Sequence, residues 1–194
     1  MRPDLTDNLI HFIRGESDET VYWKLRQILY EQRLRGGIGF IKGGYRCVCF
    51  AELSVALLRH GFVNKGGGTR YSRCGIVVPK AWLFELGGRP VIYQTDKEFD
   101  DLPESYRWRH VRFDPSNGVD FTWEREWRIP IDELIFDNSI AEVIVPDREW
   151  AERLRQDHAH DQDRCVAQYS LVLDDQLAEM FRKEFAWTLR HSRG

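Results

Sequence analysis

Short apolar runs recur along the chain between charged and glycine-rich stretches, and their length most constrains the fold. Each run is rich in β-branched and aromatic residues and too short for a long helix, which is typical of strands. The predicted strand segments are residues 8–14, 38–52, 71–78, 90–94, 108–113, 121–130, 140–146 and 165–173.

Helical patterns alternate with these strands. In residues 17–37, Ser17 or Asp18 is a suitable N-cap, an apolar stripe follows, and Gly36–Gly37 predicts the end. A single α+β domain over residues 1–194 follows, with mixed or antiparallel sheets and flanking helices. The other predicted helices span residues 53–62, 79–88, 147–160 and 174–190.

Composition excludes some classes of protein. Apolar residues make up 42% and charged residues 30%, which indicates a globular chain, and the net charge of −3 does not indicate wholesale binding to nucleic acid or membranes. The sequence still allows a local basic groove, because Lys and Arg total 28. The N-terminus shows no signal pattern, and the four cysteines show no spaced disulfide framework, so we expect a reduced, cytoplasmic protein without a membrane partner.

The segment FTWEREWRIP (121–130) carries two acids two residues apart. Strand alternation predicts Glu124 and Glu126 on one face, with side-chain bases roughly 6.5–7 Å apart. Such a pair can share one substrate, as in glycoside hydrolysis, metal binding or transfer of ADP-ribose from NAD. A solvated strand face, paired with arginines such as Arg125 or Arg128, is the plainer interpretation.

Four pieces of sequence resemble a known family. They cover most of residues 9–130 and are, in order, LIHFIR, CVCFAEL, RCGIVVPKAWLFELGGRPVIY and FTWEREWRIP. Together they resemble ADP-ribosyltransferases and the abortive-infection (AbiGi-type) phage-defence families with related bacterial domains. The resemblance implies an ADP-ribosyltransferase-like fold with a split cleft for NAD, and it does not extend to residues 131–194.

The resemblance also implies roles for single residues. Glu126 would be the catalytic acid that binds the nicotinamide ribose and stabilises the sugar cation, and Glu124 would orient or deprotonate the acceptor. Arg128 could keep both acids ionised. His11 or Arg14 would hold the ribose or phosphates of NAD. Because these two are three apart, a strand would let only one enter the cleft, and His11 is preferred.

One position departs from the family pattern. The related sequences often have Tyr-Gly-Ile where this chain has Cys74-Gly75-Ile76. Tyr71 could take over the stacking on nicotinamide, although ordinary packing at a strand edge is the preferred interpretation.

The resulting hypothesis is a protein of phage defence or of a toxin–antitoxin system that uses NAD as substrate. It would transfer ADP-ribose to a nucleic-acid or protein acceptor, or hydrolyse NAD, with a toxin or antitoxin as a possible partner. The alternative is a catalytically inactive nucleotide-binding or antitoxin module on the same fold. A glycoside hydrolase that uses both glutamates is the third hypothesis.

Other candidate sites have simpler explanations. No metal site is expected, because the spacing of Cys47, Cys49 and Cys74 does not fit zinc knuckles and buried thiols explain them. The glycine-rich residues 64–70 could contact a phosphate, but a mobile lid or a plain surface loop is the preferred interpretation. His158 and His160 fit a solvated helix end, and Glu52 fits a cap for the following helix better than a residue of the cleft.

Overall fold

Strand β1 (Asn8–Phe12) lies in the middle of the main sheet, because apolar side chains cover both of its faces. Leu9 and Ile10 point to opposite sides and are both buried. β1 pairs in antiparallel register with β4 (Gly75–Pro79) along its whole length, but with β3 (Val48–Ala51) at one registered pair, Ile10 and Ala51. The two strands β1 and β3 therefore share a much shorter registered ladder than β1 and β4.

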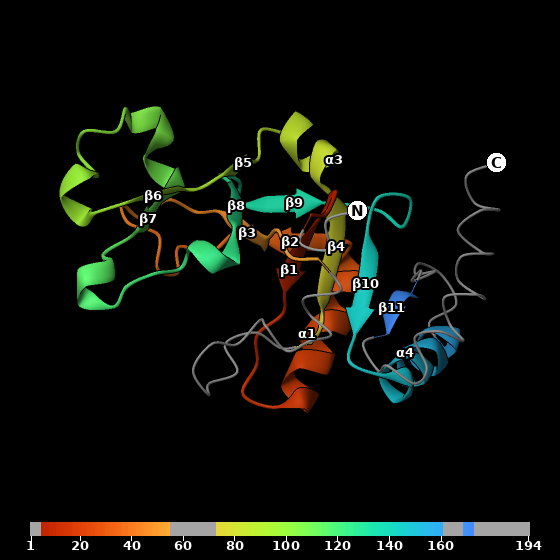
Figure 1. Ribbon diagram of the computed structural model, residues 1–194. Coiled ribbons are helices and arrows are strands. Elements are labelled where there is room, and N and C mark those ends of the chain that lie inside the picture. The colour runs from red at the N-terminus through yellow and green to blue at the C-terminus, as the bar shows by residue number, and fades with distance from the viewer. Residues whose placement is uncertain (1–4, 55–72, 161–168, 173–194) are drawn as a thin grey trace.

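The computed structural model describes residues 5–54, 73–160 and 169–172, and these form a mixed α+β fold (Figure 1). The main sheet has the order β11-β10-β4-β1-β3-β8-β5 and is antiparallel except for β10 and β11. The prediction of mixed or antiparallel sheets in an α+β fold is confirmed. The remaining strands of this sheet are β5 (Arg89–Pro90), β8 (Glu126–Ile129), β10 (Glu142–Val145) and β11 (Tyr169–Val172).

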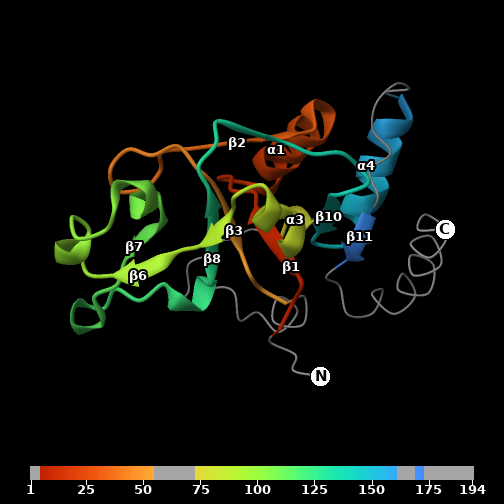
Figure 2. The ribbon, with the colours of Figure 1, turned by 90° about the horizontal axis from the view of Figure 1, so that it is seen from above.

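Two small sheets accompany the main one. Strands β2 (Arg33–Arg35) and β9 (Glu133–Ile135) pair antiparallel, and β6 (Ile92–Gln94) pairs in parallel with β7 (His110–Arg112). Figures 1 and 2 both show β6 and β7 beyond β8, at the opposite end of the molecule from α4. The connecting 3-10 helices are η1 (Asp96–Glu98), η2 (Glu104–Arg109), η3 (Pro115–Asn117) and η4 (Thr122–Glu124).

Helices cover one face of the main sheet. Apolar residues of α1 (Asp18–Glu31), α3 (Lys80–Glu85) and α4 (Arg148–His160) share a core with every second residue of the central strands. Figure 2 shows α1 above the sheet and α4 beside it. The opposite face carries a smaller core formed by Ile10, Phe12, Ala51, Leu53, Val77 and Ile144, with Trp123 packed against it.

The first helix ends earlier than the sequence predicts. Ser17 caps it as expected, since its Oγ accepts a hydrogen bond from the Thr20 amide at 3.2 Å. The end lies at Glu31 rather than at the glycine pair, because Gln32 takes a left-handed conformation (φ 51°). Residues Arg33–Arg35 then form β2, which places buried Leu34 opposite buried Leu134. Strand β9 itself had no counterpart among the predicted segments.

Several predicted segments lie outside the described residues: nearly all of the helix at 53–62, the loop at 64–70 with Tyr71 beyond it, and the helix at 174–190. Within the described ranges, no helix combines the length and the apolar character that crossing a membrane would require.

Candidate functional site

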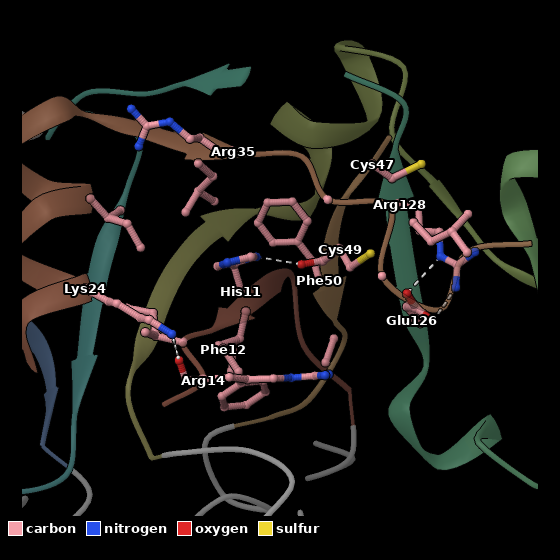
Figure 3. A pocket seen from close by; sticks show the side chains of 18 of the residues that line it. His11, Phe12, Arg14, Lys24, Arg35, Cys47, Cys49, Phe50, Glu126 and Arg128 are labelled. Carbon is pink, nitrogen blue, oxygen red and sulfur yellow. Dashed lines mark hydrogen bonds and ion pairs between the residues drawn. The ribbon is translucent and has the colours of Figure 1, made fainter. Parts of the chain in front are cut away.

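A cavity of about 740 Å³ lies where α1, β2, β1, β3 and β8 meet (Figure 3). This volume is within the usual range for sites that hold small molecules and cofactors. Its lining includes four of the residues selected from the sequence, His11, Arg14, Glu124 and Glu126, together with Arg128. Residues more than a hundred positions apart in the chain thus share one cavity.

The acidic segment does not form one long strand. Phe121 to Glu124 make a 3-10 turn, Arg125 is left-handed (φ 45°), and β8 begins only at Glu126. The prediction that both acids alternate along one strand is therefore wrong. Both nevertheless line the cavity, and both lie near Tyr93, whose pKa is raised to about 12 by burial first and by the two carboxylates in addition. Glu124 is only 4% exposed.

Glu126 forms a two-point ion pair with Arg128. The guanidinium donates from Nε to Oε1 at 2.8 Å and from Nη2 to Oε2 at 3.2 Å. Arg128 is 5% exposed, and its Nη1 also donates to the carbonyls of Trp108 and His110 at 3.0 and 2.9 Å. A buried cation with this many fixed acceptors holds the carboxylate in one orientation. The expected partnership of Arg128 with Glu126 is thus present.

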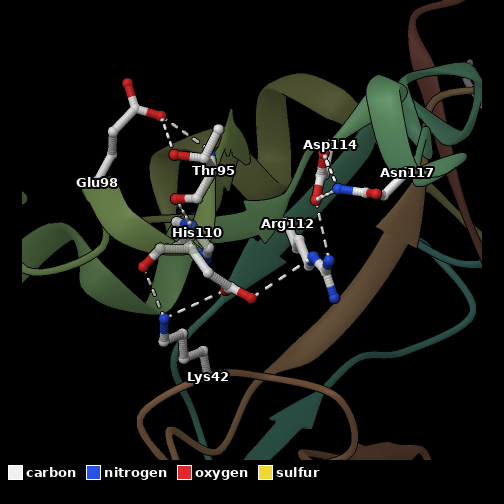
Figure 4. A network of polar contacts seen from close by, with 8 residues as sticks. Lys42, Thr95, Glu98, His110, Arg112, Asp114 and Asn117 are labelled. Atoms are coloured by element: carbon white, nitrogen blue, oxygen red, sulfur yellow. Dashed lines mark hydrogen bonds and ion pairs between the residues drawn. The ribbon is translucent and has the colours of Figure 1, made fainter.

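A network of polar contacts surrounds His110 (Figure 4), whose backbone carbonyl accepts a hydrogen bond from Arg128. His110 donates from Nε2 to the Thr95 carbonyl at 3.2 Å, since a carbonyl can only accept. Thr95 and Glu98 form a capping box, and Lys42 reaches Asp96 with two hydrogen bonds of 2.9 and 3.2 Å. The network fixes β7, and with it the His110 carbonyl that binds Arg128.

His11 and Glu126 line the cavity from opposite faces of the sheet. Ile10, Ala51 and Glu126 are register partners across β1, β3 and β8, so their side chains share one face. His11 is the next residue along β1 and packs edge-on against Phe50, with ring centroids 5.8 Å apart. Figure 3 shows His11 on one side of β3 and the Glu126–Arg128 pair on the other.

His11 is electrically neutral near pH 7. Burial lowers its pKa below the usual 6.5, and the charge of Arg14 adds to this effect, whereas the hydrogen bond to Cys49 opposes it. Its Nδ1 lies 2.8 Å from the Cys49 carbonyl, so Nδ1 carries the hydrogen and Nε2 is left as an acceptor. The ring is suited to a neutral hydroxyl donor more than to a phosphate.

Cations gather on the α1 side of the cavity. Figure 3 shows Arg14, Lys24 and Arg35 around His11. The sequence argument that only one of His11 and Arg14 could enter is wrong, because β1 ends at Phe12 and both residues line the cavity. Among all lining residues, five are arginine or lysine and two are acidic, which favours an anion. Arg33 and Arg35 also pair with Glu133 and Glu31, which lie outside the lining. Lys24 and Arg35 were not selected from the sequence, since they lie in segments interpreted as an ordinary helix.

The cysteines behave as buried thiols. Burial raises the pKa of Cys47 to about 11 and that of Cys74 to about 12, and it raises the pKa of Cys49 further, with Glu126 adding to the effect. In the part of the chain that the structure describes, no group of three His, Cys, Asp or Glu residues could hold a metal ion. The side chains of His158 and His160 lie outside that part.

Glu52 is not among the residues that line the cavity, and it binds residues 125 and 127 next to the two acids. Its carboxylate contacts Lys80, Arg125 and Trp127, and it is 8% exposed. A cap for the helix predicted at residues 53–62 stays a prediction, because that segment is not described. Tyr71 is likewise outside the described residues.

Comparisons with protein-family models, with curated proteins and with solved structures give no match to the chain. The function is therefore inferred from the cavity and from the residues that line it.

Proposed function

We propose that the cavity binds NAD and that the protein releases nicotinamide from it, passing ADP-ribose to an acceptor or to water. The observation that carries the proposal is the single cavity that joins the cations of the α1 side to Glu124 and Glu126. NAD has two phosphates near its centre and a ribose bearing the scissile bond at one end, so it matches this distribution of charge. The acceptor class implied by the resemblance is a nucleic-acid base or a protein side chain.

Each lining group has a defined task in this reaction. Arg14, with Lys24 and Arg35 nearby, would bind the phosphates, and neutral His11 would accept a hydrogen bond from a ribose hydroxyl. The bond between C1′ and the nicotinamide nitrogen breaks, and its electron pair leaves with nicotinamide. Glu126, held by Arg128, would stabilise the positive charge that develops on the ribose. Glu124 would take the proton of the attacking hydroxyl or amine.

The test is nicotinamide release from NAD by the purified protein. Wild type should release it, and Glu126→Gln should lower release by about 100-fold or more, as the loss of an electrostatic stabiliser does. Glu149→Gln, an exposed glutamate in the first turn of α4, serves as the matched control and should leave release unchanged. A wild-type protein that is inert with water, nucleic-acid and protein acceptors would overturn the enzymatic proposal.

A second candidate is a module that binds NAD or ADP-ribose without turnover. The two-point ion pair favours it, because Arg128 already occupies both carboxylate oxygens of Glu126. In that case either ligand raises the melting temperature while nicotinamide release stays at background. A wild-type protein that releases nicotinamide above background would exclude this second candidate.

A further inference from the structure

The segment that carries both glutamates contains an unfavourable backbone conformation between them. Arg125 lies between Glu124 and Glu126 and has φ 45° and ψ 50°, the left-handed region. A residue with a side chain pays roughly 1–2 kcal/mol to stay there, so neighbouring contacts must stabilise it. Without that conformation, the 3-10 turn would not join β8 at Glu126, and the two acids would not both line the cavity.

Glu52 supplies those contacts from the other side of the segment. Its Oε1 accepts from Arg125 Nη2 at 2.6 Å, and its Oε2 accepts from Trp127 Nε1 at 2.9 Å. Its backbone amide donates to the Arg125 carbonyl at 3.2 Å. Lys80 Nζ, at 3.2 Å from Oε1 and 2.8 Å from the Thr6 carbonyl, is a further contact of this carboxylate that lies outside residues 124–127. Charge-assisted bonds of a mostly buried carboxylate are strong enough to outweigh the backbone cost.

The contacts of Glu52 with Arg125 and Trp127, here called the clamp, also affect the two acids, because the clamped residues alternate with the acids along the chain. Glu52 binds residues 125 and 127, which alternate with the acids at 124 and 126. Glu52 is not among the residues that line the cavity, whereas both acids are. We propose that Glu52 is a positioning residue that holds Glu124 and Glu126 in the cavity by fixing Arg125 and Trp127 from behind. Its effect on turnover rests on the proposed function, but its effect on the segment does not.

Hydrogen–deuterium exchange tests the positioning without reference to activity. In Glu52→Gln, the amides of residues 124–126 should exchange faster by about tenfold, which corresponds to the loss of roughly 1.4 kcal/mol of local stabilisation. In wild type these amides donate to Phe121 O, Thr122 O and the Tyr93 hydroxyl. Lys80→Met is the matched control, because it removes a contact to the same carboxylate and leaves the contacts to 125 and 127 in place. It should not raise exchange in this segment.

A second variant covers the case in which Glu52→Gln does not fold. Arg125→Gln removes one contact of the clamp at a side chain that is 39% exposed, so the fold should tolerate it. It should raise exchange at the same amides. Exchange that stays at the wild-type level in the foldable variants, or that rises equally in Lys80→Met, would overturn the positioning role.

The rate of nicotinamide release is a second test, and this test depends on the proposed function. With the acids displaced, kcat for nicotinamide release should fall between about tenfold and a hundredfold in Glu52→Gln, with a smaller change in KM. Lys80→Met should keep kcat near the wild-type value. A wild-type protein without turnover would refute the proposed function alone, and the exchange result would still decide the role of Glu52. Turnover that persists undiminished while exchange rises would show that positioning does not serve catalysis.

Discussion

The buried Arg128 makes the strongest prediction at the scale of single residues. Arg128→Met leaves Glu126 and two carbonyls without their donor, so the free energy of unfolding should fall by about 3–5 kcal/mol. Arg112→Met removes exposed ion pairs with Asp96 and Asp114 and should cost about 1 kcal/mol or less. Urea denaturation of both variants measures the difference. Equal losses would contradict the importance assigned to the buried ion pair.

The lowered pKa of His11 leads us to predict that the free energy of unfolding depends on pH. Its folded-state pKa lies below the unfolded value near 6.5, so the unfolded chain takes up the proton first as the pH falls. The stabilisation that neutral His11 provides is complete above about pH 6.5 and is lost as the pH falls through the folded-state pKa. His11→Gln, which can still donate to the Cys49 carbonyl, should flatten the stability curve below the unfolded-state pKa near 6.5. Identical wild-type and variant slopes would argue against a partly buried ring that stays neutral.

At the scale of the element, the end of α1 depends on one strained residue. Gln32 is left-handed at the C-cap, a position where glycine pays no steric cost. Gln32→Gly should therefore raise the free energy of unfolding by about 0.5–1 kcal/mol. Gln27→Gly, the same substitution on an exposed turn of α1, should lower it by about 1 kcal/mol. Chemical denaturation of both variants should give opposite signs.

The elements that could be predicted from the sequence are those stabilised by contacts between residues close together in the chain. Ser17 starts α1 through a hydrogen bond three residues away, and a sequence pattern contains that information. The break at Arg125 was not predictable, because aromatic and β-branched residues favour a strand over the whole segment. What stabilises the break is Glu52, seventy-three residues away. For the same reason, the two acids expected on one strand face are separated by a break in the strand. The contacts of Glu52 with Arg125 and Trp127 at that break were not predicted either.

At the scale of the molecule, the cavity divides into a cationic and an acidic side, and this separation predicts how binding responds to salt. At ten times its Kd, ADP-ribose adds about 1.4 kcal/mol of stability, which raises the Tm of a chain of this size by about 3–6 °C. Because Arg14, Lys24 and Arg35 would bind the phosphates, the shift should shrink as sodium chloride rises from about 0.05 to 0.5 M.

Adenosine is the comparison ligand for this measurement, because it is an uncharged part of ADP-ribose that lacks the phosphates. Its smaller Tm shift should change little over the same range of salt. Arg14→Gln should reduce the ADP-ribose shift and its salt dependence together, since one cation near the phosphates is lost. A shift for ADP-ribose that is insensitive to salt, or equal shifts for the two ligands, would place the phosphates away from the α1 side. The cations there would then serve α1 and β2, where Arg35 already pairs with Glu31.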